Sequence, residues 1–157
     1  MGKESKTPPH LRIANEILRS KAFSKFVGSK EASVWFYLNS WIIRGQMNTC
    51  GLASKLYKEF YLGQKKLVAR WDQEKIAEHL GYSQKSKGYI STLVRKLEKE
   101  WKIVKTVKVP SYNSHKLNVY ELGYIDDDGT EHLYFTERFL KLAFKEKWPS
   151  PGEQKGV

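Results

Sequence analysis

Positively charged side chains are concentrated in one short stretch of this sequence. Between Ser83 and Lys108 there are eight Lys or Arg and two Glu, a net charge of +6 in 26 residues, out of +11 for the whole chain. Such a concentration is typical of a surface that binds a polyanion. Nucleic acid, anionic lipid and an acidic protein are the partners that this charge allows.

The cations fall on one side of an expected helix. Its apolar stripe, at spacings i, i+4, i+7 and i+11, is formed by Ile90, Val94, Leu97 and Trp101. The opposite face has no acid, and a helix about 10 to 12 Å wide fits the roughly 12 Å major groove of DNA. The Arg95 guanidinium can bond guanine O6 and N7 together, whereas lysines suit phosphates. The candidate DNA-binding residues here are Ser83, Lys85, Ser86, Lys87, Ser91, Thr92, Arg95, Lys96 and Lys99.

The segment before this helix fits a helix-turn-helix pattern. The order apolar, Ala, apolar, Gly, apolar is matched by Ile76, Ala77, Leu80, Gly81 and Tyr82. Ala77 lets two helices approach closely, and Gly81 ends the first helix where a side chain would obstruct the turn. Asp72 is expected to cap that first helix. Ile90 comes three residues later than in the tightest turn, so SQKSKG is expected to form an extended connection.

Two β-rich runs follow the second helix. IVKTVKV and LNVYELGYI are separated by PSYNSHK, a composition that predicts a hairpin. A hairpin beside a DNA-binding helix can reach backbone phosphate or the minor groove, and a plain solvent-exposed hairpin is an equal alternative. The candidate DNA-binding residues at its tip are Tyr112, Asn113, His115 and Lys116.

Length and composition fit one domain. The 157 residues are 40% hydrophobic and 13% aromatic, which is enough for an ordinary core. We expect a tail at 1–10, a single domain at 11–147 with the helix-turn-helix at 72–101 and the hairpin at 102–125, and a tail at 148–157. Cys50 is the only cysteine, so no internal disulfide forms and a reducing cytosol is expected. The N-terminus has no signal-peptide pattern, and no membrane span or membrane partner is expected.

Outside the charged region, the elements are expected from local patterns. One or two short helices broken around Ser20 and Gly28 should precede a core helix between Ser29 as N-cap and Gly45 as stop. That helix is apolar on most sides, which also suggests a homodimer seam. Residues 46–70 mix helical spacing with basic charge and permit no clear assignment. After a DDDGT turn, a strand-like HLYF and a helix capped by Thr136 and reaching about Lys147 should close the chain.

Sites for other chemistry are not evident. GYSQK lacks the second Gly of a nucleophile elbow, and the sequence has no Gly-rich GK[ST] loop, so we expect neither an enzyme nor a cofactor. DDDGT resembles a calcium loop only faintly, because aligning its Gly puts Tyr124 and Phe135 at ligand positions. The histidines lack metal-ligand spacing, so no metal site is expected, and His79 is interpreted as a capped or surface residue.

Considered together, residues 71–122 resemble the winged helix-turn-helix superfamily, including replication-initiator and replisome-organiser proteins of bacterial phages and plasmids. The resemblance is carried by WDQEKIAEHLGYS, GYISTLVRKLEKEWKIVK and NVYEL, and residues 11–41 look like the helical lead-in of relatives. Trp101 and Lys102 stand where relatives often have Gly and an apolar residue, and residues 46–70 look like an insertion. The resemblance implies an α+β winged helix-turn-helix fold with an N-terminal helical extension and a C-terminal helix.

The same resemblance implies sequence-specific binding of double-stranded DNA in plasmid or phage replication initiation or transcription regulation. Replication or transcription proteins would then be partners, and the protein would lie in the cytoplasm with the nucleoid or a plasmid. One rival is a protein-interaction module that uses the aromatic helix 31–44. Another is RNA or single-strand binding, in which Tyr82, Tyr89 and Tyr112 stack on bases. The plainest alternative is a basic helix face that is merely solvated.

Overall fold

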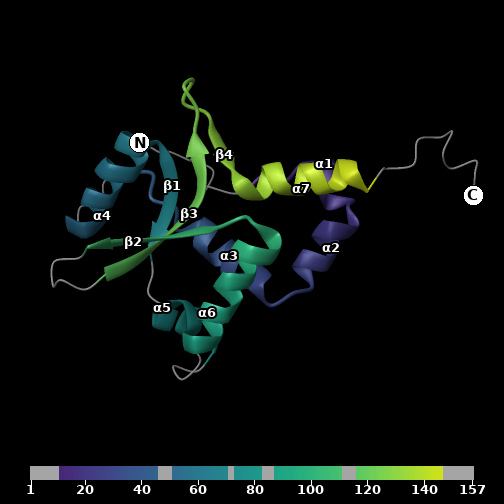
Figure 1. Cartoon of the computed structure of the whole chain (residues 1–157), viewed down its shortest axis with the longest axis horizontal. Helices are drawn as coiled ribbons and strands as arrows, with labels where there is room; N and C mark the ends of the chain where they lie inside the picture. The colour runs from purple at the N-terminus through teal and green to yellow at the C-terminus, as the bar shows by residue number, and fades with distance from the viewer. Residues whose placement is uncertain (1–10, 46–50, 71–72, 83–86, 111–115, 147–157) are drawn as a thin grey trace, which may run out of the picture.

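A computed structural model of the chain describes residues 11–45, 51–70, 73–82, 87–110 and 116–146 (Figure 1). The fold is α+β, with about seven helices and a small antiparallel sheet. Two helices, α4 and α6, continue into the π-helical segments η1 and η3. In chain order the elements are α1 Asn15–Leu18, α2 Lys21–Val27, α3 Glu31–Ser40, α4 Gly51–Leu56, η1 Tyr57–Gln64, β1 Lys66–Arg70, α5 Gln73–His79, α6 Lys87–Lys96, η3 Leu97–Trp101, β2 Lys105–Pro110, β3 Lys116–Ile125, β4 Glu131–Leu133 and α7 Tyr134–Lys145.

Strand β3 is the centre of the sheet. It pairs antiparallel with β1 on one side and with β2 on the other, and its last residues pair with β4. Strand β1 lies within residues 46–70, where the sequence permitted no assignment. Its LVA run is buried without alternation, so only its pairing with β3 distinguishes it from a core helix segment.

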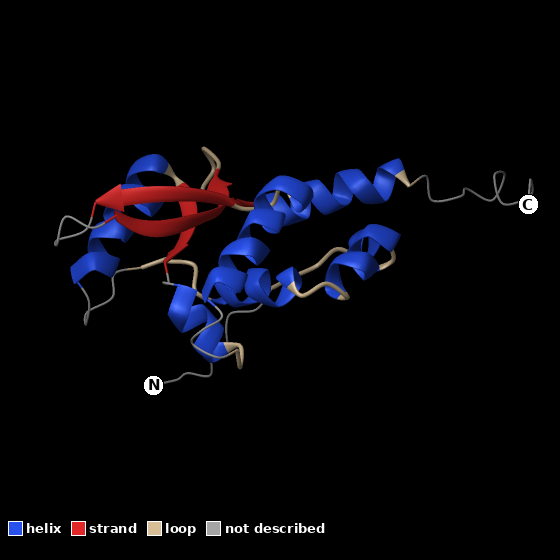
Figure 2. Ribbon diagram, turned by 60° about the horizontal axis from the view of Figure 1, so that its bottom comes forward, coloured by secondary structure: helices blue, strands red, loops and turns tan. Residues whose placement is uncertain are grey.

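The two faces of the sheet belong to different cores. Leu67, Ala69 and Tyr120 face the larger core, which α3, α6 and α7 complete. The alternate residues Val68 and Val119 face a smaller core covered by α4 and η1. Figure 2 shows α4 and the longer helices on different sides of the strands.

Aromatic rings fill the larger core. Trp35 of α3 is fully buried and stacks on Phe135 of α7, with ring centroids 4.4 Å apart. Phe26 of α2 contacts Phe139 of α7 at 5.2 Å and Trp101 of η3 at 5.1 Å. The aromatic side chains of residues 31–44 therefore pack largely within the chain. Trp41 is the exception, because it is 41% exposed.

Hydrogen bonds join the start of α2 to the end of α7. Ser20 caps α2 by accepting the Phe23 N–H at 3.1 Å. The carboxylate of Glu146, just after α7, accepts the backbone N–H groups of Lys21 at 2.9 Å and Ala22 at 2.8 Å. These bonds satisfy donors that the first turn of a helix leaves without a partner. The predicted break around Ser20 and Gly28 is confirmed, since α2 lies between them.

Three predicted boundaries are wrong. Helix α3 begins after Lys30 and ends at Ser40, so neither Ser29 nor Gly45 delimits it. The chain leaves the helix early because the Ile43 N–H donates to the Val68 carbonyl at 2.9 Å. The helix α7 begins at Tyr134 rather than after a Thr136 cap, which shortens the expected 132–135 strand to β4 at 131–133.

Gly81 closes α5 as predicted. Its φ is +85°, its N–H bonds the Glu78 carbonyl at 3.1 Å, and the Tyr82 N–H bonds the Ala77 carbonyl at 2.8 Å. This pair of bonds is the Schellman arrangement, which needs a left-handed residue at the helix end. Lysines replace glycine at two other helix ends, since Lys65 after η1 and Lys102 after η3 have φ of +58° and +62°. The position of Asp72 lies outside the described residues.

In the described part of the chain, no helix combines the length and apolar character needed to cross a bilayer.

Leu97→Ala tests the apolar stripe. Leu97 is fully buried, so we expect the cavity to lower the free energy of unfolding by about 2 to 5 kcal/mol in urea titrations. The matched control is Leu62→Ala, because Leu62 is 53% exposed, and its effect should stay within about 0.5 kcal/mol. Similar losses for both variants would contradict the assignment of the stripe.

Gly81→Ala tests the turn. A Cβ at Gly81 would meet nothing within 4 Å, so the expected loss of about 1 to 2 kcal/mol comes from the left-handed backbone alone. Gly88→Ala in α6 also meets nothing within 4 Å but has no positive φ, and it should raise stability by about 0.5 to 1 kcal/mol. Thermal unfolding of the two variants should therefore shift in opposite directions.

Candidate nucleic-acid interface

The described candidate residues of α6 and η3 lie on the surface. Thr92, Arg95, Lys96 and Lys99 are exposed, and Ser91 is half-buried. Of the predicted stripe, Ile90, Val94 and Leu97 are buried beneath them and Trp101 is half-buried, so the predicted division of the helix into two faces is confirmed. Lys87 begins α6 and Lys116 begins β3, but nothing is described of their side chains. The predicted residues outside the described part are Ser83, Lys85, Ser86, Tyr112, Asn113 and His115.

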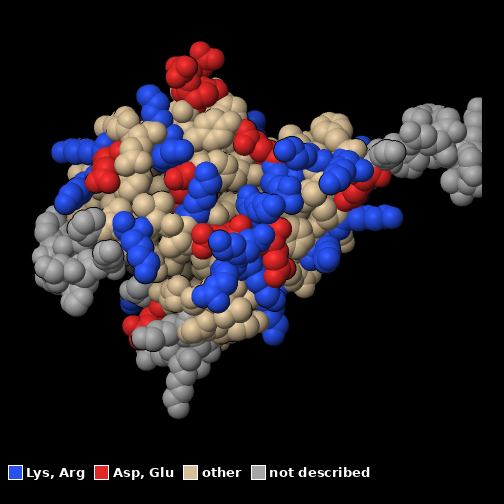
Figure 3. All heavy atoms as spheres, viewed as in Figure 1, with Lys and Arg blue, Asp and Glu red and all other residues tan. Residues whose placement is uncertain are grey.

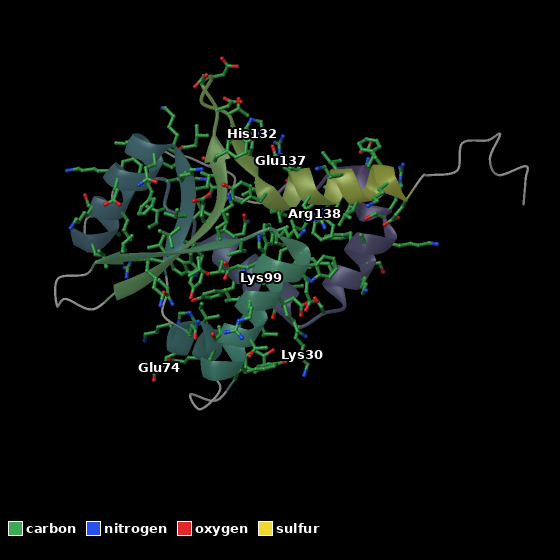
Figure 4. The ribbon with its side chains drawn as sticks, viewed as in Figure 1. Lys30, Glu74, Lys99, His132, Glu137 and Arg138 are labelled. Atoms are coloured by element: carbon green, nitrogen blue, oxygen red, sulfur yellow. The ribbon has the colours of Figure 1, made fainter. Side chains whose placement is uncertain are left out.

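Contacts at both ends hold this helix in place. Helix α5 packs against α6 and lies beside its first turns in Figure 1. At the end of η3, the Trp101 Nε1–H donates to Glu31 at 2.8 Å, and the Arg138 Nε–H donates to the Trp101 carbonyl at 3.2 Å. Lys99 lies between these ends on the face turned toward the viewer in Figure 4. The exposed cations therefore stand on a helix anchored to α3, α5 and α7.

Acids border the basic face. Glu98 lies next to it on the side toward the sheet, and its carboxylate accepts the Thr106 N–H at 3.2 Å and the Thr106 hydroxyl at 2.8 Å. Both carboxylate oxygens are used inside the fold, so Glu98 connects η3 to strand β2 of the hairpin. The helix and the base of the hairpin are thereby fixed relative to each other.

A hollow of about 190 Å³ separates the helix from the hairpin. Its lining residues come from α5, α6, η3, β2 and β3 and are Gln73, Ser91, Val94, Arg95, Glu98, Thr106, Lys108, Asn118 and Tyr120. Sequence reasoning missed Gln73, Lys108 and Asn118 as site residues. Lys108 and Asn118 are register partners in the hairpin, so period-two alternation from the buried Tyr120 could have placed both on the helix side.

The charges on this side of the molecule are unevenly distributed. Figure 3 shows basic side chains over α6, η3 and the sheet, with some acids between them, and a separate acidic group at the tip between β3 and β4. The described cations of this region are Arg95, Lys96, Lys99, Lys102, Lys105 and Lys108, against Glu98 and Glu100. The helix and the hairpin strand therefore carry basic side chains, as do the α4 and α7 sides of this view.

Aromatic rings near the start of α6 are mostly engaged by the protein. Tyr82 is half-buried against the larger core and meets Tyr89 edge-on, with centroids 5.6 Å apart. Tyr89 is 36% exposed, and the ammonium of Lys30 lies 5.8 Å from its ring centroid. Lys30, the N-cap residue of α3 labelled in Figure 4, thus adds a cation beside the helix. Tyr112 lies outside the described residues.

The acidic turn between β3 and β4 is organised by its own side chains. Asp126 accepts the Asp128 and Thr130 N–H groups at 2.9 and 3.0 Å, and His132 Nε2 lies 2.7 Å from its other oxygen. The hydrogen bond with His132, followed by the bond from Thr130, lowers the pKa of Asp126 below its ordinary value. In the described residues, no group of three or more His, Cys, Asp or Glu could hold a metal ion. His79 bonds through Nδ1 to the Tyr37 hydroxyl.

No protein-family model, curated protein or solved structure matches this chain. The features from which a function can be inferred are therefore those of the chain itself. They are the exposed cationic helix, the hairpin fixed beside it and the hollow between them.

Asp126→Asn tests the turn through its pH dependence. Because the folded state lowers the pKa of Asp126, the ionised carboxylate stabilises the fold above its ordinary pKa of 3.8, and that stabilisation disappears as the pH falls through the lower folded value. The parent should therefore be more stable than Asp126→Asn at neutral pH, with a difference that shrinks below about pH 4. Thermal unfolding across this range measures it. Asp127→Asn is the control, because it removes an exposed carboxylate from the same turn.

Proposed function

We propose that this chain is a winged helix-turn-helix protein that binds double-stranded DNA in a sequence-specific manner. The order of its elements supports the proposal. The helices α5 and α6 follow each other through a glycine-containing turn, as in helix-turn-helix motifs, and the β2–β3 hairpin comes directly afterwards. The second helix of such a pair enters the major groove, and a hairpin beside it can reach the backbone.

The observation that carries the proposal is the exposed face of α6 and η3. Thr92, Arg95 and Lys99 lie on successive turns, on the side of the helix away from the apolar stripe that packs into the core. A helix face that is only solvated usually carries both charges. Here the two acids of the segment lie at the borders, and Glu98 is bound by Thr106.

The biological process follows from the resemblance rather than from geometry. We propose plasmid or phage replication initiation or transcription regulation, with proteins of those processes as partners and a location at the nucleoid or a plasmid. A homodimer also stays a prediction. The apolar helix α3 leaves little surface for such a dimer, because Val34, Trp35 and Leu38 are fully buried within the chain. The same burial disfavours the aromatic helix as a protein-interaction surface.

Duplex binding should depend strongly on salt. About five to eight neutralised phosphates imply a slope of roughly −4.5 to −7 in a plot of log affinity against log salt. Fluorescence anisotropy with a labelled duplex measures this slope. A single strand of equal length should bind more weakly, because a groove-entering helix requires the duplex shape. Equal or tighter single-strand affinity would favour base stacking instead.

Lys99→Ala tests whether the exposed face of α6 and η3 contacts DNA. The loss of one phosphate contact should weaken all duplexes alike and reduce the size of the salt slope by about one unit. Lys58→Ala is the control, because Lys58 is an exposed lysine of η1 on the other side of the sheet. If Lys99→Ala behaves like Lys58→Ala while circular dichroism is unchanged, the basic face does not bind DNA.

A further inference from the structure

The hollow between α6 and the hairpin arises where the sheet extends past the helices. On the helix-facing side, Tyr120 belongs to the larger core, whereas Asn118, two residues nearer the hairpin tip, and its partner Lys108 line the hollow. Ser91 and Arg95 of α6 form the opposite wall. One cation from the helix and one from the strand therefore face the same small space.

The hollow is rich in hydrogen-bond donors. Among the described residues, neither Arg95 nor Lys108 has an ion-pair or hydrogen-bond partner. Gln73, Ser91 and Asn118 add amide and hydroxyl donors around them. The one carboxylate in the lining, Glu98, is already bonded to Thr106 through both oxygens. Its negative charge remains, so Arg95 and Lys108 together with Glu98 leave the lining with a net charge of +1.

A small anion with several acceptor oxygens satisfies this arrangement best. A guanidinium and an ammonium on opposite walls can bind different oxygens of one phosphate, and neutral donors can complete its coordination. A base edge in the major groove, by contrast, would have to be reached by Arg95 alone, pointing away from Lys108. The pairing of the two cations therefore favours phosphate over base.

We propose that the hollow binds a single backbone phosphate of the DNA, held between Arg95 of α6 and Lys108 of β2. This inference rests on the proposed duplex binding and changes the role of Arg95. The sequence suggested that Arg95 reads a guanine, whereas here it positions the helix through the backbone. The bound phosphate would contact both the helix, through Arg95, and the hairpin, through Lys108. Glu98 connects the same two elements within the protein through its bonds to Thr106.

A methylphosphonate scan tests the proposal. Each phosphate of a duplex bound by the parent protein is replaced in turn by the neutral methylphosphonate, and affinities are measured by anisotropy. One linkage should weaken the parent at least about tenfold, because Arg95 and Lys108 both lose a charged acceptor there. The same linkage should have no effect on the Arg95→Ala, Lys108→Ala double variant. Circular dichroism checks that the variants are folded.

Lys105→Ala is the matched control, because it removes one exposed cation from the same strand, on the opposite side of the pleat from Lys108. It should keep the full tenfold sensitivity at that linkage. The inference is overturned if the double variant keeps that sensitivity, or if Arg95→Ala weakens the preferred duplex while leaving random duplex unchanged. Absence of any duplex binding by the parent would instead overturn the proposed function itself.

Discussion

The whole arrangement depends on burying both faces of strand β3 while both of its edges are paired. Its hydrogen bonds require β1 and β2, and its alternating side chains require one layer of helices on each side. Tyr120 and Leu122 lie in the larger core, and Val119 lies in the smaller one. Because α7 packs on this strand and α6 packs on α3 and α5 in the same core, the exposed face of α6 points away from that core. On the same face of the sheet, β2 and β3 extend past the larger core, so Lys108 and Asn118 lie beyond it and line the hollow.

Local features of this fold could be predicted from the sequence, and features that depend on distant partners could not. The stripe containing Leu97 and the turn at Gly81 follow from helical spacing and from glycine's access to positive φ, which are properties of neighbouring residues. Strand β1 was missed because LVA is a short apolar run whose identity depends on β3, more than 45 residues later. The end of α3 at Ser40 was misjudged because a bond from Ile43 to Val68 decides it. The hollow was missed because its two walls meet only in the folded chain.

The connections from η1 to β1 and from η3 to β2 each contain a lysine in the left-handed conformation. Lys65 and Lys102 each follow a π-helical segment, and a strand begins one residue after the first and three residues after the second. A non-glycine residue in this region costs roughly 1 to 2 kcal/mol. Lys102 therefore carries this backbone cost at the end of η3. A charged side chain at this position also keeps the cationic surface continuous from η3 toward β2.

The bond between Glu146 and the first turn of α2 has a consequence for how the protein is made. A chain leaving the ribosome presents Phe26 and Trp35 long before Phe135 and Phe139, the rings against which they pack. The larger core stays open on one side until α7 has been synthesised, and Glu146 then closes the ring of helices across 125 residues of sequence. The larger core is therefore completed only after α7 has left the ribosome, and until then Phe26 and Trp35 lack the α7 rings against which they pack.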